Sequence, residues 1–562
     1  GVSRHPAAYI CWQMQTGAYV SHLLKTQLHA GAAAHPSWRD EFDAAVLLVD
    51  IAGSSGLTER FAAQGPHGAE RLNTVLDQYF GEVFDIVAAH GGDVVQIEGD
   101  AVLAIWREGR EQDGPAHHAA AAAIALRDAF NGRRLVFDVV LRHRIALATG
   151  AVTAVTFQNP GDRGYHAVTG APIRELASLA HAGDPGEIFM SERFAECLGT
   201  AATTSDGGNA GHASRCLVAL NGQMRPAAIE PFTVEGAAAA LAHRYLPRVV
   251  GERADASEAG WMAEFRMITV VHTQLGGLDP AAPDAADGIL RAIEAVRTAI
   301  EPLSARLFEL VVGDKGVIAV LACGLPGQAR ENDATRGLEA ARRMHASLRG
   351  LGVAASIGVA TGRAFCSDVG NRSRRHFLVN GPLMHRSARL MQNAGGAILI
   401  DDATVRAASA AATSRFRFTE PEPLMVRGLR EPLMAHRFDD DARPDSETSP
   451  PRRPAWLHGR ESEVQAFGQM LDALAQGRGG AVSIEAESGA GKSHLLRQFD
   501  MAAQARGFTV ITMTTSAFQT HEAYAACRGL VRRLLGKPGD PPGPPASLLR
   551  ERLLGALRRA PA

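Results

Sequence analysis

Two aspartates early in the chain occupy positions where a carboxylate can meet a cation or a phosphate. Asp50 ends the apolar run AAVLLVD and precedes the small-residue turn IAGSSG, so we expect it at the tip of a buried strand. Such a tip is exposed at the edge of a sheet, where hard cations and phosphates reach it. Asp100 lies in the turn of the predicted strand hairpin DVVQIEGDAVLAIW. Either aspartate alone is more often structural, because turns favour aspartate, but the pair is a more specific signal.

Phosphate-binding chemistry is predicted again near the C-terminal end of the sequence. The apolar segment AVSIEA at residues 481–486 is expected to be a strand, followed by ESGAG, a Lys-Ser pair and a helix, HLLRQFDMAAQARG. This order is the setting that a Walker A motif requires. Backbone N–H groups of the loop would cradle phosphates, the lysine would reach the β- and γ-phosphates of ATP, and the serine would ligate Mg²⁺. The residues of this P-loop are Gly489, Gly491, Lys492 and Ser493, with Ala486 in place of the first glycine.

These residues lie in a chain that repeats itself, which indicates a duplicated α/β unit of about 180 residues. Each copy has a strand hairpin, then a buried strand that ends in glycine, and then glycine, a helix, a glycine-containing turn and a strand. The hairpins are 93–106 and 307–324, the buried strands are 144–150 and 356–362, and the last units are 170–191 and 381–402.

Composition divides the chain into six segments. Residues 438–455, FDDDARPDSETSPPRRPA, are polar and proline-rich, as linkers between domains are. A weaker break falls near 200–260, where small and polar residues dominate. We therefore expect a helical lead-in at 1–39, a first domain at 40–200, a connecting segment at 201–259, a second domain at 260–438, a linker at 439–455 and a third domain, truncated at its end, at 456–562.

The overall composition excludes several classes of protein. The chain has 562 residues, of which 46% are hydrophobic and 21% charged, as in soluble globular proteins. A formal net charge of −2 gives no electrostatic case for binding nucleic acid or an anionic membrane. No apolar run of about 18 residues occurs, so no transmembrane helix is expected. The six cysteines are far apart, which indicates a reducing, cytoplasmic compartment and neither a disulfide framework nor a zinc site.

The sequence VDIAGSSGLTERF, followed by GGDVVQIEGDAVLAIW, resembles the signature of the class III adenylyl and guanylyl cyclases. The resemblance covers roughly residues 35–440 and is closest to the soluble, bicarbonate-responsive adenylyl cyclases. It implies an α/β (α+β) multidomain chain: two ferredoxin-like cyclase domains that form a pseudo-dimer, then the start of a P-loop NTPase domain. The family holds two divalent cations, Mg²⁺ or Mn²⁺. The resemblance assigns their ligation to Asp50, Asp100 and the carbonyl of Ile51.

Active sites of this family form between two cyclase domains, one supplying the metal ligands and the other the base-recognition and transition-state groups. The second domain has FRMITVVHTQLGG at residues 265–277 where the first has its aspartate strand, so His272 and Thr273 replace the metal region. The resemblance therefore implies one metal-binding site and one degenerate site. In the degenerate site the related enzymes bind bicarbonate with a lysine and an arginine. Gln96 and Ala177 stand at those positions, so bicarbonate activation is not expected.

The segment RRHFLVNGPLMHRSARLM at residues 374–391 resembles the family helix that carries an asparagine and an arginine. Arg389 falls on the arginine, which bonds the α-phosphate of the transition state, because a guanidinium offers several fixed donors. His385 falls on the asparagine that orients the ribose. Leu378 falls where adenylyl cyclases have an acceptor for the adenine amino group, and Arg427 lies near the late phosphate-binding lysine.

The preferred base stays open between adenine and guanine. Lys315 lies in the hairpin turn Gly-Asp-Lys-Gly, which matches the soluble adenylyl cyclases, and a solvated turn lysine is an equally good interpretation. Counting back onto the strand gives Glu309, which would favour guanine, because the N1–H and amino group of guanine are donors. Leu378 cannot accept a hydrogen bond. We expect a modest preference for adenine, with GTP as a detectable competitor.

The sequence thus predicts an adenylate cyclase that converts ATP to 3′,5′-cyclic AMP and pyrophosphate by two-metal catalysis, coupled to a signalling NTPase domain. One alternative is a guanylyl cyclase. Another is a catalytically inactive cyclase-like regulator of the NTPase domain, which Leu378 and His385 favour, whereas Asp50, Asp100 and Arg389 favour the enzyme. A P-loop regulator whose cyclase domains only dimerise is disfavoured, because both metal acids are present. The expected partners are a nucleoside triphosphate and, within the chain, the other cyclase domain.

Overall fold

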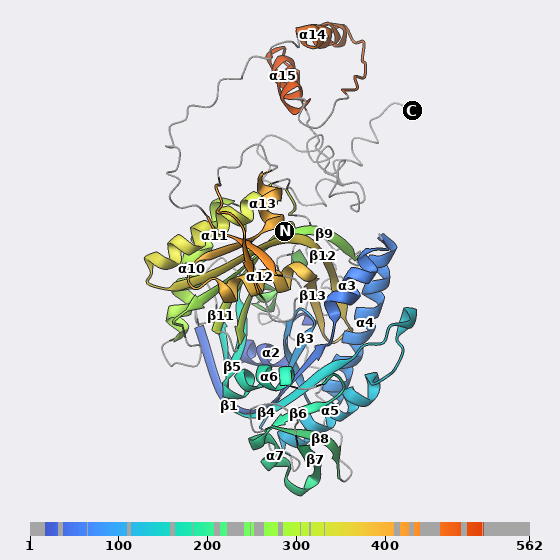
Figure 1. Ribbon diagram of the computed structural model, residues 1–562, viewed down its shortest axis with the longest axis vertical. Helices are drawn as coiled ribbons and strands as arrows, with labels where there is room; N and C mark the ends of the chain where they lie inside the picture. The colour runs from blue at the N-terminus through green and yellow to red at the C-terminus, as the bar shows by residue number, and fades with distance from the viewer. Residues whose placement is uncertain are drawn as a thin grey trace. The chain divides into compact units, whose positions relative to one another are not determined.

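Two sheets of the same topology form the first unit of the chain, Gly1–Asp439, and the second unit is Asp440–Ala562 (Figure 1). The computed structural model describes residues 17–31, 37–64, 66–108, 114–157, 163–182, 184–206, 214–221, 241–247, 249–251, 263–278, 285–303, 305–313, 316–326, 328–330, 332–409, 416–425, 432–438, 461–484, 492–508 and 510.

The first half of the first unit, residues 37–221, is one eight-stranded sheet with helices on both faces. Its strands are β1 (Ser37–Ile51), β2 (Asp93–Glu98), β3 (Ala101–Arg107), β4 (His143–Phe157), β5 (Tyr165–Gly170), β6 (Ile188–Ser191), β7 (Ala202–Asp206) and β8 (Ser214–Leu220). Its helices are α3 (Ser54–Ala62), α4 (Pro66–Ala89), α5 (Pro115–Phe130), α6 (Ala171–Ala182) and α7 (Glu192–Leu198). The strand order is β2-β3-β1-β4-β6-β8-β7, with β5 paired to β4.

The second half, residues 263–438, repeats this order as β10-β11-β9-β12-β14-β16-β15, with β13 paired to β12. Its strands are β9 (Glu264–Gly276), β10 (Leu307–Gly313), β11 (Gly316–Cys323), β12 (Ala354–Gly370), β13 (Arg375–Asn380), β14 (Ile398–Asp401), β15 (Glu422–Leu424) and β16 (Leu433–His436). Its helices are α10 (Ala285–Ile300), α11 (Asp333–Gly350), α12 (Pro382–Asn393) and α13 (Asp402–Ser409). The duplication predicted from the sequence is confirmed.

The central strand β1 is buried on both sides, as its unbroken apolar run predicts. Because successive side chains point to opposite faces, Ala45, Leu47 and Val49 join the core under α4 and α5. Ala44 and Val46 join the core under α6 on the other face. The strand therefore delivers its last residues to the sheet edge in a fixed orientation.

The strands β4 and β12 run past the glycines at which the sequence predicts their ends. After Gly150, β4 continues to Phe157, and after Gly362, β12 continues to Gly370. The extra residues are held by antiparallel pairing on both sides, with β1 and β5 in the first half and with β9 and β13 in the second. These long-range partners cannot be read from local periodicity.

Each half contributes apolar side chains to the hydrophobic core of the other. The core of the first half includes Phe265, Phe365, Val369 and Leu378 of the second. The core of the second half includes four residues of the first, Val155, Phe157, Tyr165 and Ala167. Polar contacts from α4 to the end of β12 and the turn after it reinforce this packing: Ser367 Oγ to Asn73 Oδ1 (2.6 Å), Gly370 N to Asp77 Oδ1 (3.0 Å) and Asn371 Nδ2 to Asp85 Oδ1 (2.7 Å). The halves therefore form the pseudo-dimer that the sequence predicts.

Two segments that precede the halves pack on the second sheet. We call residues 17–29, with α2 (His22–His29), the first lead-in, and residues 241–251 the second lead-in. Val20, Leu24 and Leu28 of the first lead-in share one apolar cluster with residues of the second lead-in and of β9, β10 and β11. Ser21 caps the start of α2, because its side chain accepts from the N–H of Leu24.

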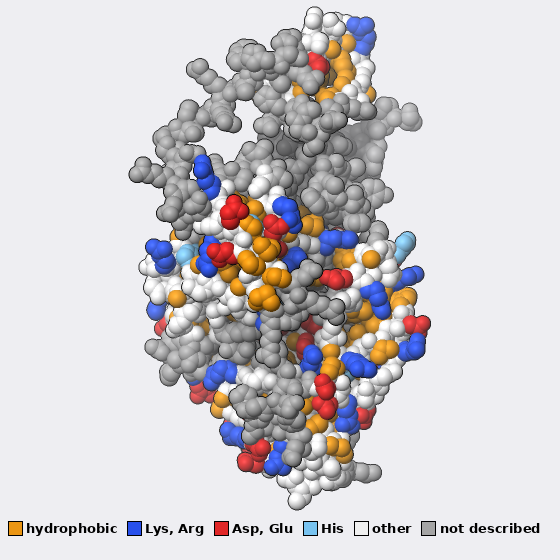
Figure 2. Space-filling view, viewed as in Figure 1, with side chains coloured by type: hydrophobic (Ala, Val, Ile, Leu, Met, Phe, Trp, Pro, Cys, Tyr) orange, Lys and Arg blue, Asp and Glu red, His pale blue; other side chains and the backbone are white. Residues whose placement is uncertain are grey.

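The first sheet extends beyond the predicted domain end at residue 200. The strands β7 and β8 pair with each other, and β8 pairs with β6, so the sheet ends at Leu220. It also begins at Ser37, before the predicted residue 40. Among the described residues, no helix combines the length and apolar character needed to cross a membrane. Basic and acidic side chains are interspersed over the described surface in Figure 2, which agrees with the net charge of −2.

In the second unit, two helices are described, α14 (Glu461–Ala475) and α15 (Lys492–Ala505). They pack through stacked rings of Phe467 and Phe499, with centroids 3.9 Å apart. The strand predicted at 481–486 is not formed over its described part, residues 481–484. A strand is defined by hydrogen bonds to a neighbour, and the described residues provide no partner strand there.

Candidate active site

Asp50 and Asp100 lie together at one edge of the first sheet. Asp50 is the penultimate residue of β1, and Asp100 lies in the turn that joins β2 to β3. Because β1 pairs with β3, with Val49 opposite Val102, the strand tip and the turn are adjacent. The two carboxyl groups are within hydrogen-bonding distance of each other. The structure thus brings together two aspartates that are fifty positions apart in the sequence.

Burial dominates the electrostatics of this pair. It raises the pKa of Asp50 to about 7, with the charge of Asp100 adding to the effect and that of Arg144 opposing it. Asp100 is only 7% exposed, and burial raises its pKa as well, while a hydrogen bond from Ser54 lowers it. Arg144 is the cross-strand neighbour of Asp50 on β4. One buried and one partly buried carboxylate, with one adjacent arginine, leave a site that favours a further positive charge.

The second half of the unit reaches this site through α12. The charge of His385, on the exposed side of that helix, lowers the pKa of Asp100. Arg389 lies one turn further along, where its Nη1 donates to Gln392 Oε1 at 3.0 Å. The structure therefore brings His385 into range of the aspartates, while Arg389 lies on the same helix and contacts its own neighbour.

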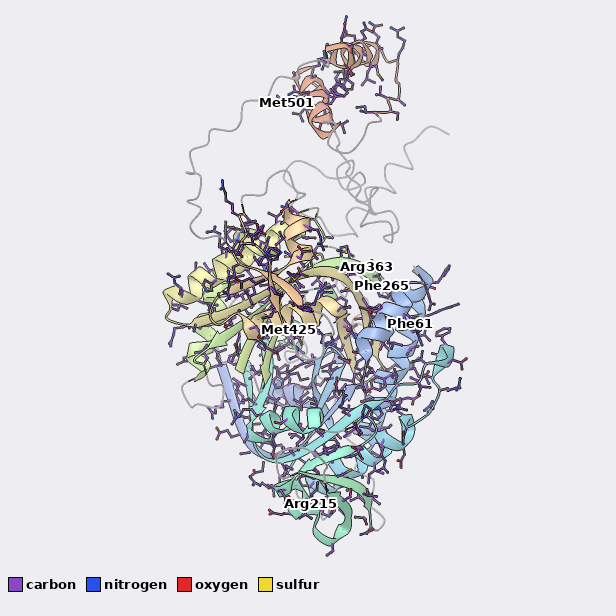
Figure 3. The ribbon with its side chains drawn as sticks, viewed as in Figure 1. Phe61, Arg215, Phe265, Arg363, Met425 and Met501 are labelled. Carbon is purple, nitrogen blue, oxygen red and sulfur yellow. The ribbon has the colours of Figure 1, made fainter. Side chains whose placement is uncertain are left out.

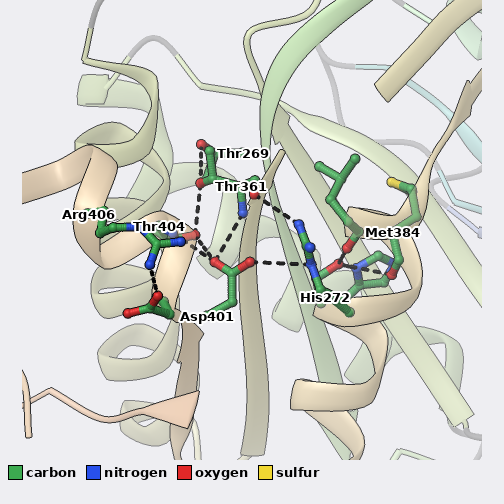
Figure 4. A network of polar contacts seen from close by, with 11 residues as sticks. Thr269, His272, Thr361, Met384, Asp401, Thr404 and Arg406 are labelled. Carbon is green, nitrogen blue, oxygen red and sulfur yellow. Dashed lines mark hydrogen bonds and ion pairs between the residues drawn. The ribbon is translucent and has the colours of Figure 1, made fainter. Parts of the chain in front are cut away.

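Buried polar contacts fix α12 on the second sheet (Figure 4). Ser387 Oγ lies 2.8 Å from His272 Nδ1 on β9. Arg386 Nη2 donates to the Thr361 carbonyl at 3.1 Å, and its Nε lies 3.5 Å from Asp401. His272, predicted to replace a metal ligand, thus anchors the helix that carries His385.

A glycine allows α12 to lie this close to β12. A Cβ built at Gly358 would lie 2.0 Å from the Ser387 carbonyl oxygen and 2.4 Å from the Met391 nitrogen. Both atoms belong to the helix backbone, so no side-chain rotation could relieve the clash. The glycine of the SIGVATG segment is therefore needed for the helix to approach.

The register of the second sheet shows what stands opposite Asp50 in the duplicated half. Gly150 of β4 pairs with Ala44, and the matching Gly362 of β12 pairs with Ile268. Asp50 lies as many residues after Ala44 as Gln274 lies after Ile268. Gln274, and not His272 or Thr273, therefore occupies the position of Asp50. The second half has no carboxylate there.

Comparisons with known proteins find relatives that match most of this chain. Adenylate cyclase type 10 of Rattus norvegicus is 22% identical over 571 residues, which cover 88% of this chain and 33% of that protein. The Homo sapiens protein of the same name is 21% identical over 579 residues, or 92% of this chain and 34% of that protein. The chain is homologous to the type 10 adenylate cyclases. It spans about a third of the length of these relatives.

Two further comparisons concern parts of the chain. The family model described as AAA ATPase domain matches residues 457–562, so an ATPase-type domain follows the two sheets. A class III adenylyl cyclase-like ATP-binding protein from Pseudomonas aeruginosa aligns with a TM-score of 0.47 and 14% identity, over 66% of this chain and 85% of that chain.

The residues predicted to read the base differ from one another in their surroundings. Leu378 is 1% exposed and belongs to the apolar cluster between the halves with Phe265 and Phe365. The ring of Phe265 also lies under the guanidinium of Arg363, 5.3 Å from its centroid (Figure 3). An apolar side chain is therefore what the packing at position 378 requires.

Glu309 follows a β-bulge on β10 and is partly buried. Burial raises its pKa to about 8, the negative charge of Glu98 in the first half adds to this, and Arg163 opposes it. Gln96 follows the matching bulge on β2, so the two halves present Gln96 and Glu309 at equivalent positions. Lys315 and Arg427 lie outside the described residues.

The P-loop and the degenerate cleft are described only in part. Gly489 and Gly491 lie outside the described residues, and Lys492 and Ser493 form the first turn of α15 without described side chains. The side chain of Ala177 is likewise not described.

The aspartate pair has the donor set of a site for hard divalent cations. Carboxylate oxygens are the ligands that Mg²⁺ and Mn²⁺ prefer, and a carbonyl such as that of Ile51, at the end of β1, is of the same kind. Among the described residues, no three His, Cys, Asp or Glu side chains cluster as metal ligands. Substrate phosphates and water would complete the coordination, as is usual for Mg²⁺ sites.

Two residues beside the pair are not predicted from the sequence. The phenol of Tyr79, on α4, is fully buried, and its hydroxyl has no hydrogen-bond partner among the described residues. Burial raises its pKa, and the nearby charges of Asp50 and Asp100 add to the rise. Ser54, which hydrogen-bonds Asp100, is the other. Tyr79 belongs to no local motif, and only the packing of α4 brings it to the site. Ser54 lies in the turn that follows Asp50, but its contact with Asp100 depends on the fold.

Proposed function

We propose that this chain is a class III nucleotidyl cyclase, which converts ATP to 3′,5′-cyclic AMP and pyrophosphate at one site between its two halves. The adjacent carboxyl groups of partly buried Asp50 and buried Asp100, with His385 of the other half near enough to lower the pKa of Asp100, carry the proposal. A structural core tolerates one paired carboxyl group, but two adjacent and buried ones cost stability without a cation. The homology to adenylate cyclases supports the same reaction class.

In this proposal each side chain has a distinct role. Asp50, Asp100 and the carbonyl of Ile51 bind two divalent cations, Mg²⁺ or Mn²⁺. Bound there, these cations supply Lewis-acid activation of the ribose 3′-hydroxyl and neutralise the leaving pyrophosphate. His385 hydrogen-bonds the ribose. Arg389, once released from Gln392, donates to the α-phosphate, where charge develops in the transition state.

Adenine is the proposed base, with guanine as a competitor. Glu309 is positioned on the strand that follows the bulge, and its raised pKa leaves it largely neutral near pH 7. A neutral carboxyl group offers one donor and one acceptor, which match N1 and the amino group of adenine.

The ATPase-type domain is proposed to bind ATP and Mg²⁺ through Lys492 and Ser493.

The test measures cyclic nucleotide formation by the full 562-residue chain with Mn²⁺ and either ATP or GTP. We expect cyclic AMP from the wild-type protein, and a loss of roughly a hundredfold or more in Asp50→Asn and Asp100→Asn, because removing a cation is worth several kcal/mol. Asp43→Asn is the matched control, since Asp43 lies on the same strand and is exposed. Activity that survives in Asp50→Asn would reject the proposal.

An inactive cyclase-like regulator is the second candidate, and the exposed His385 in place of the family asparagine favours it. It predicts that the wild-type chain binds ATP at the interdomain site but forms no cyclic nucleotide with Mn²⁺ or Mg²⁺. GTP turnover above ATP turnover, abolished by Glu309→Lys, would instead identify a guanylyl cyclase.

A further inference from the structure

Each half of the first unit extends an arm that grips the other half. We call residues 163–170, with β5, the first arm and residues 374–381, with β13, the second arm. Both arms end in a glycine of positive φ, Gly170 (147°) and Gly381 (158°), immediately before α6 and α12. Counting back equally from these glycines gives Arg163 and Arg374. The two arginines therefore hold equivalent places in the duplicated fold.

The guanidinium groups of these arginines cross the interface. Arg374, of the second half, donates from Nε to the carbonyl of Val94 on β2, in the first half, at 3.1 Å. Arg163, of the first half, donates from Nη1 to the carbonyl of Phe308 on β10, in the second half. Each arm thus holds the hairpin of the opposite half.

Both acceptor carbonyls lie at β-bulges. The register of β2 against β3 shifts between Val94 and Gln96, and that of β10 against β11 shifts between Leu307 and Glu309, leaving Phe308 as the unpaired residue. A bulge interrupts the ladder and frees backbone groups for other partners. An arginine, with five donors in a rigid fork, is suited to satisfy such a carbonyl while bonding a second one.

The second acceptor of each arginine is a backbone carbonyl of a lead-in. Arg374 Nη1 donates to the Ala18 carbonyl at 3.3 Å, and the neighbouring Arg375 N–H donates to the same carbonyl at 2.7 Å. In the other half, Arg163 Nε donates to the Tyr245 carbonyl at 3.4 Å, and the Gly164 N–H donates to the Arg244 carbonyl at 2.8 Å.

The arms hold the lead-ins crosswise. The first lead-in precedes the first half but is held by the second arm, and the second lead-in precedes the second half but is held by the first arm. The carboxylate of Asp93 accepts from the N–H groups of His22 (3.0 Å) and Leu23 (2.7 Å), at the start of α2. This attaches the first lead-in to β2, beside Val94.

We propose that Arg163 and Arg374 are a matched pair of positioning residues that set how the two halves close on the nucleotide. This inference rests on the cyclase function proposed above. Arg374 holds β2, whose hairpin carries the metal ligand Asp100. Arg163 holds β10 at the residue before Glu309, which faces the base. The two arginines therefore control different steps: Arg374 the metal-dependent chemistry, and Arg163 the choice of base.

The first test does not depend on activity. Amide hydrogen exchange is compared in the full chain for wild type, Arg374→Gln and Arg163→Gln. We expect Arg374→Gln to speed exchange in residues 17–29 and 93–98, and Arg163→Gln to speed it in 241–251 and 307–313, because each loses a pair of backbone partners. Arg127→Gln is the control, since Arg127 donates to the Val218 carbonyl within one half. Faster exchange only within the mutated residue's own half would overturn the crosswise clamp.

The second test separates the two roles. We expect Arg374→Gln to lower kcat roughly ten- to a hundredfold with little change in the ATP to GTP ratio, as for the loss of charged hydrogen bonds. Arg163→Gln should change that ratio more than kcat for ATP. Arg374→Lys keeps the charge but not the fork, so it should fold normally and recover only part of the activity. Both Gln variants could show faster hydrogen exchange in the opposite half but unaltered kinetics. That result would reject the positioning role and leave the proposed reaction standing.

Discussion

At the scale of single residues, the aspartate pair gives a prediction that needs no catalysis. Without a cation, the partly buried Asp50 and the buried Asp100 lie together. Burial raises the pKa of both, and the charge of Asp100 adds to the rise at Asp50. Replacing Asp100 by Asn removes one charge while keeping the shape. In a chelator we therefore expect Asp100→Asn to melt a few degrees above wild type.

Divalent cations should reverse that order. Mn²⁺ should raise the melting temperature of the wild-type protein and leave that of Asp100→Asn unchanged, because binding to the native state stabilises it. Asp43→Asn should behave as wild type in both conditions. Differential scanning fluorimetry measures these melting temperatures. If Mn²⁺ raised the melting temperature equally in all three proteins, there would be no metal site at the pair.

Glu309 predicts a base preference that depends on pH. Its pKa is raised to about 8 by burial and the charge of Glu98, against the opposing charge of Arg163. Below this pH the neutral carboxyl group complements adenine. Above it, the carboxylate only accepts and complements the two donors of guanine. The ratio of kcat/KM for ATP to that for GTP should therefore fall, by roughly tenfold, as pH rises from about 6.5 to 9.

The control for this pH dependence is Glu309→Gln. An amide always offers one donor and one acceptor, as the neutral acid does, so this variant should keep the preference for ATP at every pH. A ratio that falls with pH in the variant as it does in wild type would assign the titration to another group.

At the scale of elements, the placement of α12 depends on one glycine. A Cβ at Gly358 would meet the helix backbone at 2.0 Å, so Gly358→Ala must push α12, with His385 and Arg389, away from the sheet. We expect a loss of about 1–3 kcal/mol in the free energy of unfolding, as for other overpacked sites, together with loss of cyclase activity. Gly350→Ala is the control, because a Cβ there meets nothing within 4 Å. Full activity in Gly358→Ala would show that α12 does not position the site.

The elements also show how far sequence reasoning reaches. Both hairpins and the glycine-led helices α6 and α12 follow from local periodicity and turn residues. The extension of β4 beyond Gly150, and the addition of β7 and β8 to the first sheet, depend on partners distant in the sequence. The pairing of the two aspartates was predicted through the family signature. The place of Tyr79, the contact of Ser54 with Asp100 and the anchoring role of His272 were not, because they follow from packing between elements.

At the scale of the whole first unit, the two halves repeat one topology yet carry different chemistry. The cleft with Asp50 has two carboxyl groups, while the register of the second sheet places Gln274 at the equivalent position. An amide cannot replace a carboxylate in neutralising a divalent cation, because it carries no charge. Of these two equivalent positions only that of Asp50 has a carboxylate, so the proposed function implies one metal-dependent nucleotide site in the first unit.

This asymmetry predicts the number of nucleotides bound. With Mn²⁺ and 3′-deoxy-ATP, which lacks the nucleophile, isothermal titration calorimetry should give two sites per wild-type chain, one in the cyclase cleft and one at the P-loop. Lys492→Ala should remove the second and leave one. Adding Asp50→Asn should remove that one as well, because the remaining cleft has Gln274 and no acid. If Lys492→Ala still binds two nucleotides, the cleft beside Gln274 is also a nucleotide site, and the two halves are equivalent in binding though they differ in sequence.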